Sequence, residues 1–231
     1  MNYIIFNGKD SRDVKGLLIS ELPPIVKPNL RVKETVIDGV DGSIIEELGY
    51  EPYDRAVSIA LKVGADIDKV MDFFTGSGKI IFSNEPEKCY IGQIIKSIEY
   101  VRVLRYRTAK VVFRVQPFKY NRVEVTRQAT SERKSMNITN EGNYLAKPII
   151  TLCGSGTIEL SLNGNKIFQY TFPQGEYYVT IDSEKQDAYW QGTLKNRNMY
   201  GDFPIFNKGN NALAWDGSVY QISIEKYSRW L

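Results

Sequence analysis

Short apolar runs separated by turn-forming residues constrain the fold of this chain more than any other feature. Tyr, Phe, Val and Ile dominate the runs, and Gly, Asn, Asp or Pro interrupt them. Aromatic and β-branched residues favour strands, whereas the interrupting residues favour turns. The pattern therefore predicts a mainly β protein, with strands near residues 3–6, 17–20, 30–37, 56–63, 79–82, 90–103, 109–116, 148–152, 157–161, 166–172, 177–181 and 219–226.

Two dipeptides mark tight turns between such runs. Asn163-Gly164 separates two apolar runs at the spacing of a β-hairpin, because Asn and Gly tolerate the positive φ angles of a tight turn. Asp41-Gly42 is a similar candidate. We therefore expect a hairpin at each position.

One segment has the periodicity of a helix, near residues 66–76. Asp66 can cap its N-terminus by accepting backbone N–H bonds, and Gly76 can end it. The apolar positions that would face the core are Ile67, Val70, Met71 and Phe74.

The chain divides by composition into two domains. Residues 1–125 combine strands with the helix, and residues 141–231 have short strands and Gly/Asn turns but no helical period. The segment 126–140 is polar and poor in large apolar residues, as linkers are. We therefore predict a β-rich domain with one helix, a linker and a β-sandwich.

Charge and cysteine content exclude several kinds of protein. The net charge is only +3, too small for a protein that coats DNA or is held at a membrane by basic residues. Cys89 and Cys153 lie far apart in strand-like runs, and we expect two buried thiols. The apolar run Tyr3–Phe6 is shorter than a signal-peptide core, so we expect folding in a cytoplasm.

The chain contains no histidine. This excludes Ser-His-Asp and Cys-His catalysis, and two cysteines without histidine cannot form a Cys/His zinc site. Glycosidase chemistry needs only two carboxylates in a cleft, and Glu46, Glu47, Glu85 and Glu87 form the acidic clusters. Solvated charge is the simpler interpretation of Glu46-Glu47, so we expect no enzyme, no cofactor and no metal.

Seven basic residues without an acidic one suggest a nucleic-acid surface: Arg102, Arg105, Arg107, Lys110, Arg114, Lys119 and Arg122. However, polar and apolar residues alternate over 109–116, as on a strand with one solvated face. We therefore favour a solvated face or a protein interface and expect no specific nucleic-acid binding.

The aromatic residues of the second domain suggest an alternative function. Trp190 and Trp215 are candidate sugar contacts, because sugar-binding modules stack sugars on exposed aromatic rings. Aromatic residues of a β-sandwich more often lie in its core. A carbohydrate-binding adhesin remains the alternative hypothesis.

Several motifs in order resemble a known family. They are Phe6-Asn7-Gly8, Leu22-Pro23-Pro24, Val115-Gln116-Pro117-Phe118-Lys119-Tyr120, Asn140-Glu141-Gly142, Lys147-Pro148-Ile149-Ile150, Gly154-Ser155-Gly156, Gly201-Asp202-Phe203-Pro204 and Gly209-Asn210-Asn211. Together they resemble the distal tail (Dit) family of long-tailed bacteriophages. The resemblance implies a split-barrel-like N-terminal domain, which Gln116, Pro117, Phe118 and Tyr120 would close at the domain junction, and a galectin-like C-terminal sandwich.

The resemblance also implies a function and partners. Family members form a ring of six subunits at the tip of the tail tube, assembled in the host cytoplasm. The ring joins the tube protein to the tail-associated hub protein, and its C-terminal domains can carry receptor-binding proteins; no membrane is involved. A hairpin arm from each subunit clasps its neighbour, here about residues 37–53. Its candidate contacts are Gly39, Asp41, Gly42, Ile44, Ile45, Leu48 and Tyr50.

Overall fold

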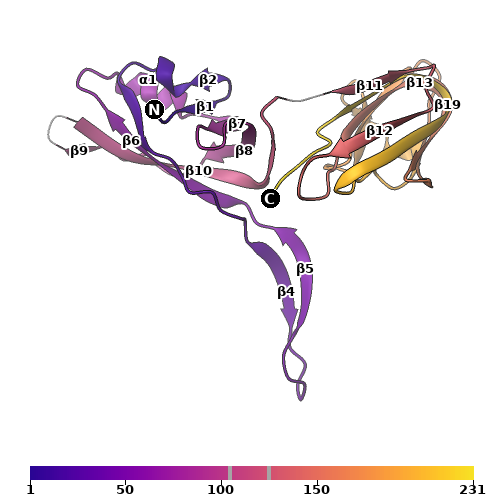
Figure 1. Ribbon diagram of the computed structural model, residues 1–231, viewed down its shortest axis with the longest axis horizontal. Coiled ribbons are helices and arrows are strands. Elements are labelled where there is room, and N and C mark those ends of the chain that lie inside the picture. The colour runs from indigo at the N-terminus through magenta and orange to yellow at the C-terminus, as the bar shows by residue number, and fades with distance from the viewer. Residues whose placement is uncertain (104–105, 124–125) are drawn as a thin grey trace. The chain divides into compact units, whose positions relative to one another are not determined.

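Two units, Met1–Arg122 and Val123–Trp230, each contain a large antiparallel sheet and a separate core (Figure 1). The structure is a computed structural model and describes residues 1–103, 106–123 and 126–231. Each of the predicted apolar runs contains a strand, so the prediction of a mainly β fold is confirmed. Arg105, one of the predicted basic residues, lies outside the described residues.

The sheet of the first unit curls into a half-barrel with the strand order β2-β1-β7-β8-β10-β6-β3, and β9 pairs with β10. Alternation along β10 places Val111 and Phe113 in the core and Lys110 in solvent, which confirms the predicted solvated face. The strands are β1 (Ile4–Phe6), β2 (Lys9–Asp10), β3 (Leu17–Glu21), β6 (Tyr53–Leu61), β7 (Ser77–Phe82), β8 (Lys88–Ile94), β9 (Val101–Val103) and β10 (Tyr106–Asn121).

The helix α1 (Ile67–Phe73) is shorter than predicted and faces the core differently. Asp66 caps it, as predicted, by accepting backbone N–H bonds from the next turn. Val70 and the two phenylalanines at positions 73 and 74 are buried, whereas Met71 is exposed. Val70, Phe73 and Phe74 have the i, i+3, i+4 spacing of one helix face, and that face is buried. Met71 lies on the other, exposed side.

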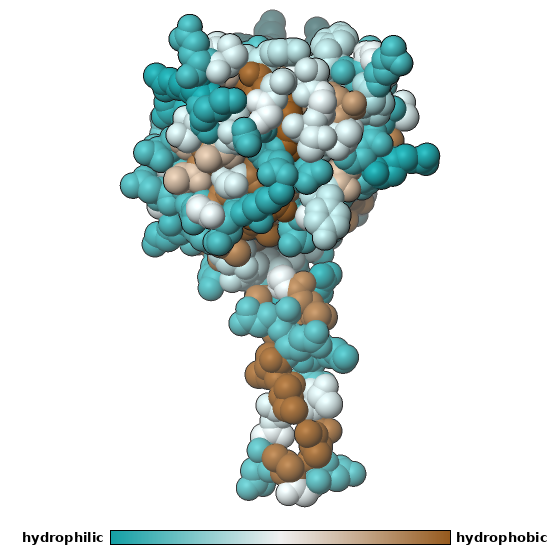
Figure 2. All heavy atoms as spheres, turned by 90° about the vertical axis from the view of Figure 1, so that its right-hand side faces the viewer, coloured by the Kyte–Doolittle hydropathy of each residue, from teal (hydrophilic) through white to brown (hydrophobic). Residues whose placement is uncertain are grey.

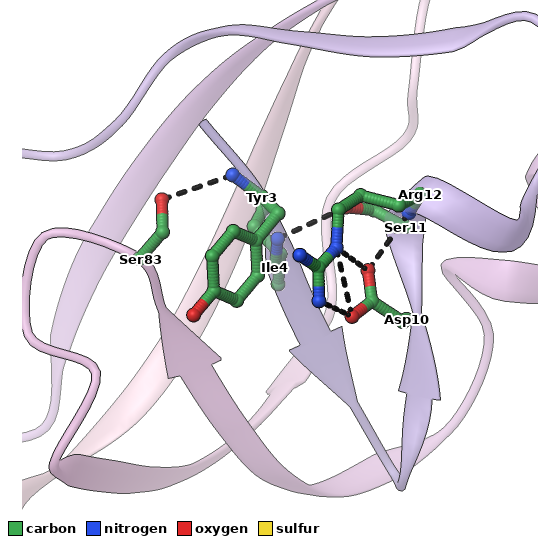
Figure 3. A network of polar contacts seen from close by, with 6 residues as sticks. All are labelled: Tyr3, Ile4, Asp10, Ser11, Arg12 and Ser83. Atoms are coloured by element: carbon green, nitrogen blue, oxygen red, sulfur yellow. Dashed lines mark hydrogen bonds and ion pairs between the residues drawn. The ribbon is translucent and has the colours of Figure 1, made fainter. Parts of the chain in front are cut away.

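Polar contacts fix the start of the chain against the sheet (Figure 3). The backbone N–H of Tyr3 donates to the hydroxyl of Ser83 at 2.9 Å. Asp10 accepts the backbone N–H of Arg12 at 2.8 Å and also binds its guanidinium, which lies over the Tyr3 ring. These hydrogen bonds hold the pKa of Asp10 below its usual value, although burial opposes them. The edge strand β2 and its neighbour β1 are therefore tied to the sheet by side chains as well as by their ladder.

The second unit is a sandwich in which two long strands pass through both layers. One half of β13 pairs with β15 and with the end of β19, and its other half pairs with β14 and with the start of β19. Both strands change layer where their register shifts, next to Gly154 and Gly217. The strands are β11 (Arg127–Thr130), β12 (Ser135–Asn140), β13 (Ile149–Leu162), β14 (Asn165–Thr171), β15 (Tyr178–Asp182), β16 (Asp187–Trp190), β17 (Thr193–Leu194), β18 (Met199–Gly201) and β19 (Gly209–Glu225).

The predicted linker at 126–140 is wrong. This segment contains β11 and β12, which pair with opposite ends of β19 and bury Ala129 and Ile138. Its polar residues occupy the solvent side of edge strands, so its composition resembles that of a linker. The Asn163-Gly164 turn is confirmed, because both residues have positive φ angles between β13 and β14.

The two cysteines are free thiols. Cys89 is buried, as predicted, but Cys153 is only partly buried. Burial raises the pKa of the Cys153 thiol. No helix in the described parts of the chain is long and apolar enough to cross a membrane.

Candidate interaction surface

A hairpin of two strands, β4 (Leu30–Thr35) and β5 (Ile44–Tyr50), projects from the first unit (Figure 1). It forms a sheet of its own and, within the described residues, pairs with no strand of the larger sheet. All of β4, the turn and β5 as far as Leu48 are exposed. We call residues 30–50 the arm. An isolated two-stranded hairpin is at best marginally stable in water, so we expect contacts with another surface to stabilise the arm.

Large apolar side chains are exposed along the whole arm (Figure 2). Ile44 and Ile45 are 60% and 62% exposed, and Leu48 is 42% exposed. The predicted contacts did not include five further exposed apolar residues, although the predicted arm contained two of them, Ile37 and Val40; the other three are Leu30, Val32 and Val36. Val36-Ile37 is an apolar pair next to an acidic residue, as Ile44-Ile45 is, whereas Leu30 and Val32 stand singly among basic residues. The arm therefore presents more apolar surface than the sequence suggested.

Both faces of the arm mix apolar and charged side chains. Directly paired residues lie on the same face of a hairpin. Glu34 pairs with Ile45, and the adjacent pair Lys33–Glu46 lies on the opposite face, where the side chains are 3.8 Å apart. Neither face could form the inner side of an ordinary sandwich. Contacts on both sides of the arm would bury its apolar groups.

The turn of the arm differs from the prediction by three residues. The backbone N–H of Val40 donates to the carbonyl of Ile37 at 3.2 Å, so the closed turn is centred on Asp38-Gly39. Gly39 and Gly42 both have positive φ angles, and a Cβ at either position would meet no atom within 4 Å. Backbone geometry, and not close packing, is what requires glycine there.

The base of the arm rests on the predicted junction segment. The Tyr50 ring meets the Phe118 ring edge-on, with centroids 5.9 Å apart, and the Lys27 ammonium lies 5.8 Å from the Tyr50 ring. Tyr50 is therefore placed to anchor the arm on its own unit. The exposed contacts lie further out, from Leu48 to the turn.

A bulge in β10 positions Phe118. Between Val115 and Lys119 the register against β8 shifts, so that β10 advances by four residues while β8 advances by two. Pro117 lies in this bulge, because proline has no N–H to donate to a ladder. Gln116 is exposed and Tyr120 is half-buried. The segment lies within the last strand of the first unit, just before Arg122, where that unit ends.

Charged side chains are buried beneath the sheet, next to this bulge. Glu85 accepts hydrogen bonds from Lys119, at 2.9 Å, and from the Tyr90 hydroxyl, and it lies 3.6 Å from the Arg55 guanidinium. Arg55 also stacks over the rings of Tyr90 and Phe82. Burial alone would raise the pKa of Glu85, but these hydrogen bonds and the two cations outweigh burial and lower it. Burial and the bond to Glu85 raise the pKa of Tyr90.

The acidic residues considered for glycosidase chemistry lie in different settings. Glu46 and Glu47 are on the exposed arm, and Glu87 is exposed in the turn before β8. Among the described residues, Glu85 is surrounded by two cations and a phenol, not by a second carboxylate. A glycosidase needs a raised pKa on its acid, whereas the pKa of Glu85 is lowered.

The tryptophans considered for sugar binding are largely covered. Trp215 is 4% exposed and belongs to the core of the second unit, so that contact is wrong. Trp190 is half-buried, with the Lys195 ammonium 5.4 Å from its ring and paired with Glu176 at 2.5 Å. The exposed aromatic side chains of this unit are tyrosines, led by Tyr200 at 79%.

Comparisons with known proteins extend this picture. No protein-family model matches the sequence, and no curated protein matches it. Among solved structures, the chain is similar to the Dit protein of phage SPP1, described as a paradigm of the hub adsorption apparatus in phages that infect Gram-positive bacteria. The TM-score is 0.76 at 17% identity, over 100% of both chains. A chain of the phage P2 baseplate in its activated conformation has a TM-score of 0.50 at 8% identity, over 98% of both chains. The chain therefore has a Dit-like fold along its whole length.

Proposed function

We propose that this chain is a structural protein of a bacteriophage tail tip, in which copies of the chain form a closed ring, with six as the expected number. The ring joins the tail tube protein to the tail-associated hub protein, and the second unit is the place for a receptor-binding protein. The protein assembles in the host cytoplasm and needs no cofactor and no membrane. The Dit-like fold over the whole chain supports the assignment.

The exposed apolar arm is the observation that carries the proposal. A ring needs two different surfaces on each subunit that complete each other. The arm supplies one of them, because its apolar side chains have no place in the core of its own unit. Burying a large apolar side chain contributes about 1.5–3 kcal/mol before the cost of ordering it. Several such residues on each arm can hold a subunit in a ring.

The mass of the full chain in solution tests the proposal. Light scattering on a sizing column should give a multiple of the subunit mass of 26.4 kDa, and negative-stain images should show rings. Leu48→Asp places a charge in the arm interface and should shift the mass to that of a monomer. Leu194→Asp is the matched control, because Leu194 is exposed in the second unit. A monomer at every concentration, or rings that survive Leu48→Asp, would contradict the proposal.

A further inference from the structure

A basic groove lies at one end of the first unit. It has a volume of about 700 Å³, and its lining residues are Leu61, Lys62, Val63, Gly64, Ala65, Arg102, Tyr106 and Arg107. The described lining residues include three basic side chains and no acidic one. It also has an apolar part, because Val63 is 78% exposed and Tyr106 is 52% exposed. Within the described part of the chain, no acidic side chain forms an ion pair with Lys62 or Arg107.

The tip of the arm has the opposite charge and the same mixture of groups. We call residues 36–43 the tip. It presents Asp38 and Asp41 beside the exposed apolar residues Val36, Ile37 and Val40. Over the arm as a whole, five acidic residues against two basic ones give a net charge of −3. The tip and the groove thus match in both charge and apolar character.

The two surfaces lie at opposite ends of one strand. The arm leads into the start of β6 at Tyr53, and the groove begins at the last residue of β6, Leu61. At a rise of about 3.3 Å per residue, these ends are about 26 Å apart. The arm also runs away from the sheet (Figure 1), so its tip points away from the groove of its own chain. A second copy is the occupant that this arrangement fits.

We propose that the tip of one subunit docks in the basic groove of the next subunit around the ring. This inference rests on the proposed function and adds the receiving surface. Asp38 and Asp41 pair with Lys62 and Arg107, and the apolar side chains of the tip pack on Val63 and Tyr106. The charges set the direction of docking, because an arm against an arm or a groove against a groove brings like charges together.

Disulfide trapping in the full chain tests the contact directly. Val40→Cys in the tip and Val63→Cys in the groove are combined with Cys153→Ser, and Cys89 stays because it is buried. Mild oxidation should produce a ladder of covalent oligomers that ends at the ring number. Either single variant should give dimers at most. Val40→Cys with Ile95→Cys is the matched control, because Ile95 is as exposed as Val40 but lies outside the groove.

A charge exchange provides the second measurement. Lys62→Glu with Arg107→Glu should raise the concentration at which the ring dissociates by roughly tenfold, as expected for two exposed ion pairs. Adding Asp38→Lys and Asp41→Lys to the same chain should reverse most of that change. Circular dichroism checks that each variant is folded.

The outcomes separate this inference from the proposed function. Rings that are dissolved by Leu48→Asp but give no ladder with Val40→Cys and Val63→Cys would overturn the groove and leave the ring proposal standing. A chain that neither assembles nor forms a ladder would overturn both. A ladder that equals the one from the Ile95→Cys control would also overturn the groove, because it would reflect random collision.

Discussion

The carboxylate of Glu85 balances two cations that lie deep in the first unit. Arg55 is 1% exposed and Lys119 is 8% exposed, and both face this one carboxylate. Ionic groups held away from water are tolerated only while their charges are compensated. Lys119 belongs to the segment that the resemblance places at the domain junction, and Glu85 lies in the turn before β8. Their ion pair therefore links the β10 bulge to that turn.

Replacing Glu85 should therefore destabilise the first unit. Glu85→Gln leaves Arg55 and Lys119 without a counter-charge, and we expect the free energy of unfolding to fall by about 3 kcal/mol. Urea unfolding of the full chain measures this change. Glu87→Gln is the control, since Glu87 is exposed, and its effect should stay within about 0.5 kcal/mol. Equal effects of the two changes would show that the buried ion pairs contribute little.

The same carboxyl predicts a loss of stability in acid. The pKa of Glu85 in the folded protein lies below 4.5, so the unfolded chain binds its proton first as the pH falls. Its contribution is complete above pH 4.5 and is lost as the pH drops through the lowered pKa. Unfolding measured from pH 6 to pH 3 should show a smaller loss for Glu85→Gln than for the unchanged chain. Parallel curves would contradict this assignment.

Residue type predicted only some of the candidate site. Ile44, Ile45 and Leu48 could be named because the family resemblance implies a hairpin arm over this segment, and they are apolar residues within it. Trp215 was assigned to a sugar site because its type suits stacking, but its exposure depends on β13, some fifty residues away. A side chain's chemistry is readable locally, whereas its accessibility depends on strands distant in the sequence.

At the scale of elements, Gly217 lets β19 pass between the layers of the sandwich. Its φ angle is +97°, and a Cβ there would lie 2.4 Å from the carbonyl oxygen of Thr157 on β13. Gly164 also has a positive φ angle, +85°, but a Cβ there would meet nothing within 4 Å. The two positions share a backbone conformation and differ in the space around them.

This pair separates backbone strain from steric overlap. Gly164→Ala should cost only the strain of a left-handed conformation, about 1 kcal/mol. Gly217→Ala should cost about 2 kcal/mol more, because β13 and β19 must also move apart to make room for the added methyl group. Thermal unfolding of the two variants measures the difference. Similar midpoints for the two would mean that the crossing of the layers tolerates a side chain.

Elements with local signals were predictable, and elements defined by distant partners were not. The Asn163-Gly164 hairpin and the cap of α1 depend on neighbours in sequence, and both were found. The strands β11 and β12 have few apolar residues of their own and exist because β19, much later in the sequence, pairs with both of them. The predicted helical face included Met71 because the sequence does not show where so short a helix ends.

For the whole molecule, the two separate cores predict separate behaviour of the two units. Residues 1–122 contain the arm, the groove and the first core, so this fragment should form the same ring as the full chain. Residues 123–231 should fold and remain monomeric, because the second core lies wholly within them. Light scattering of both fragments measures this. A monomeric first fragment beside a ring-forming full chain would place part of the interface in the second unit.

The strand β6 carries the arm at one end and the groove at the other. Where each arm occupies the next groove, the turn from one subunit to its neighbour depends on the angle between these two surfaces. That angle depends on the twist of β6, which has nine residues. Strand twist varies with sequence and with bulges such as the one between β3 and β6. In the proposed ring, the curvature of this single strand would thus set the rotational symmetry, and small changes there would alter how many subunits close the circle.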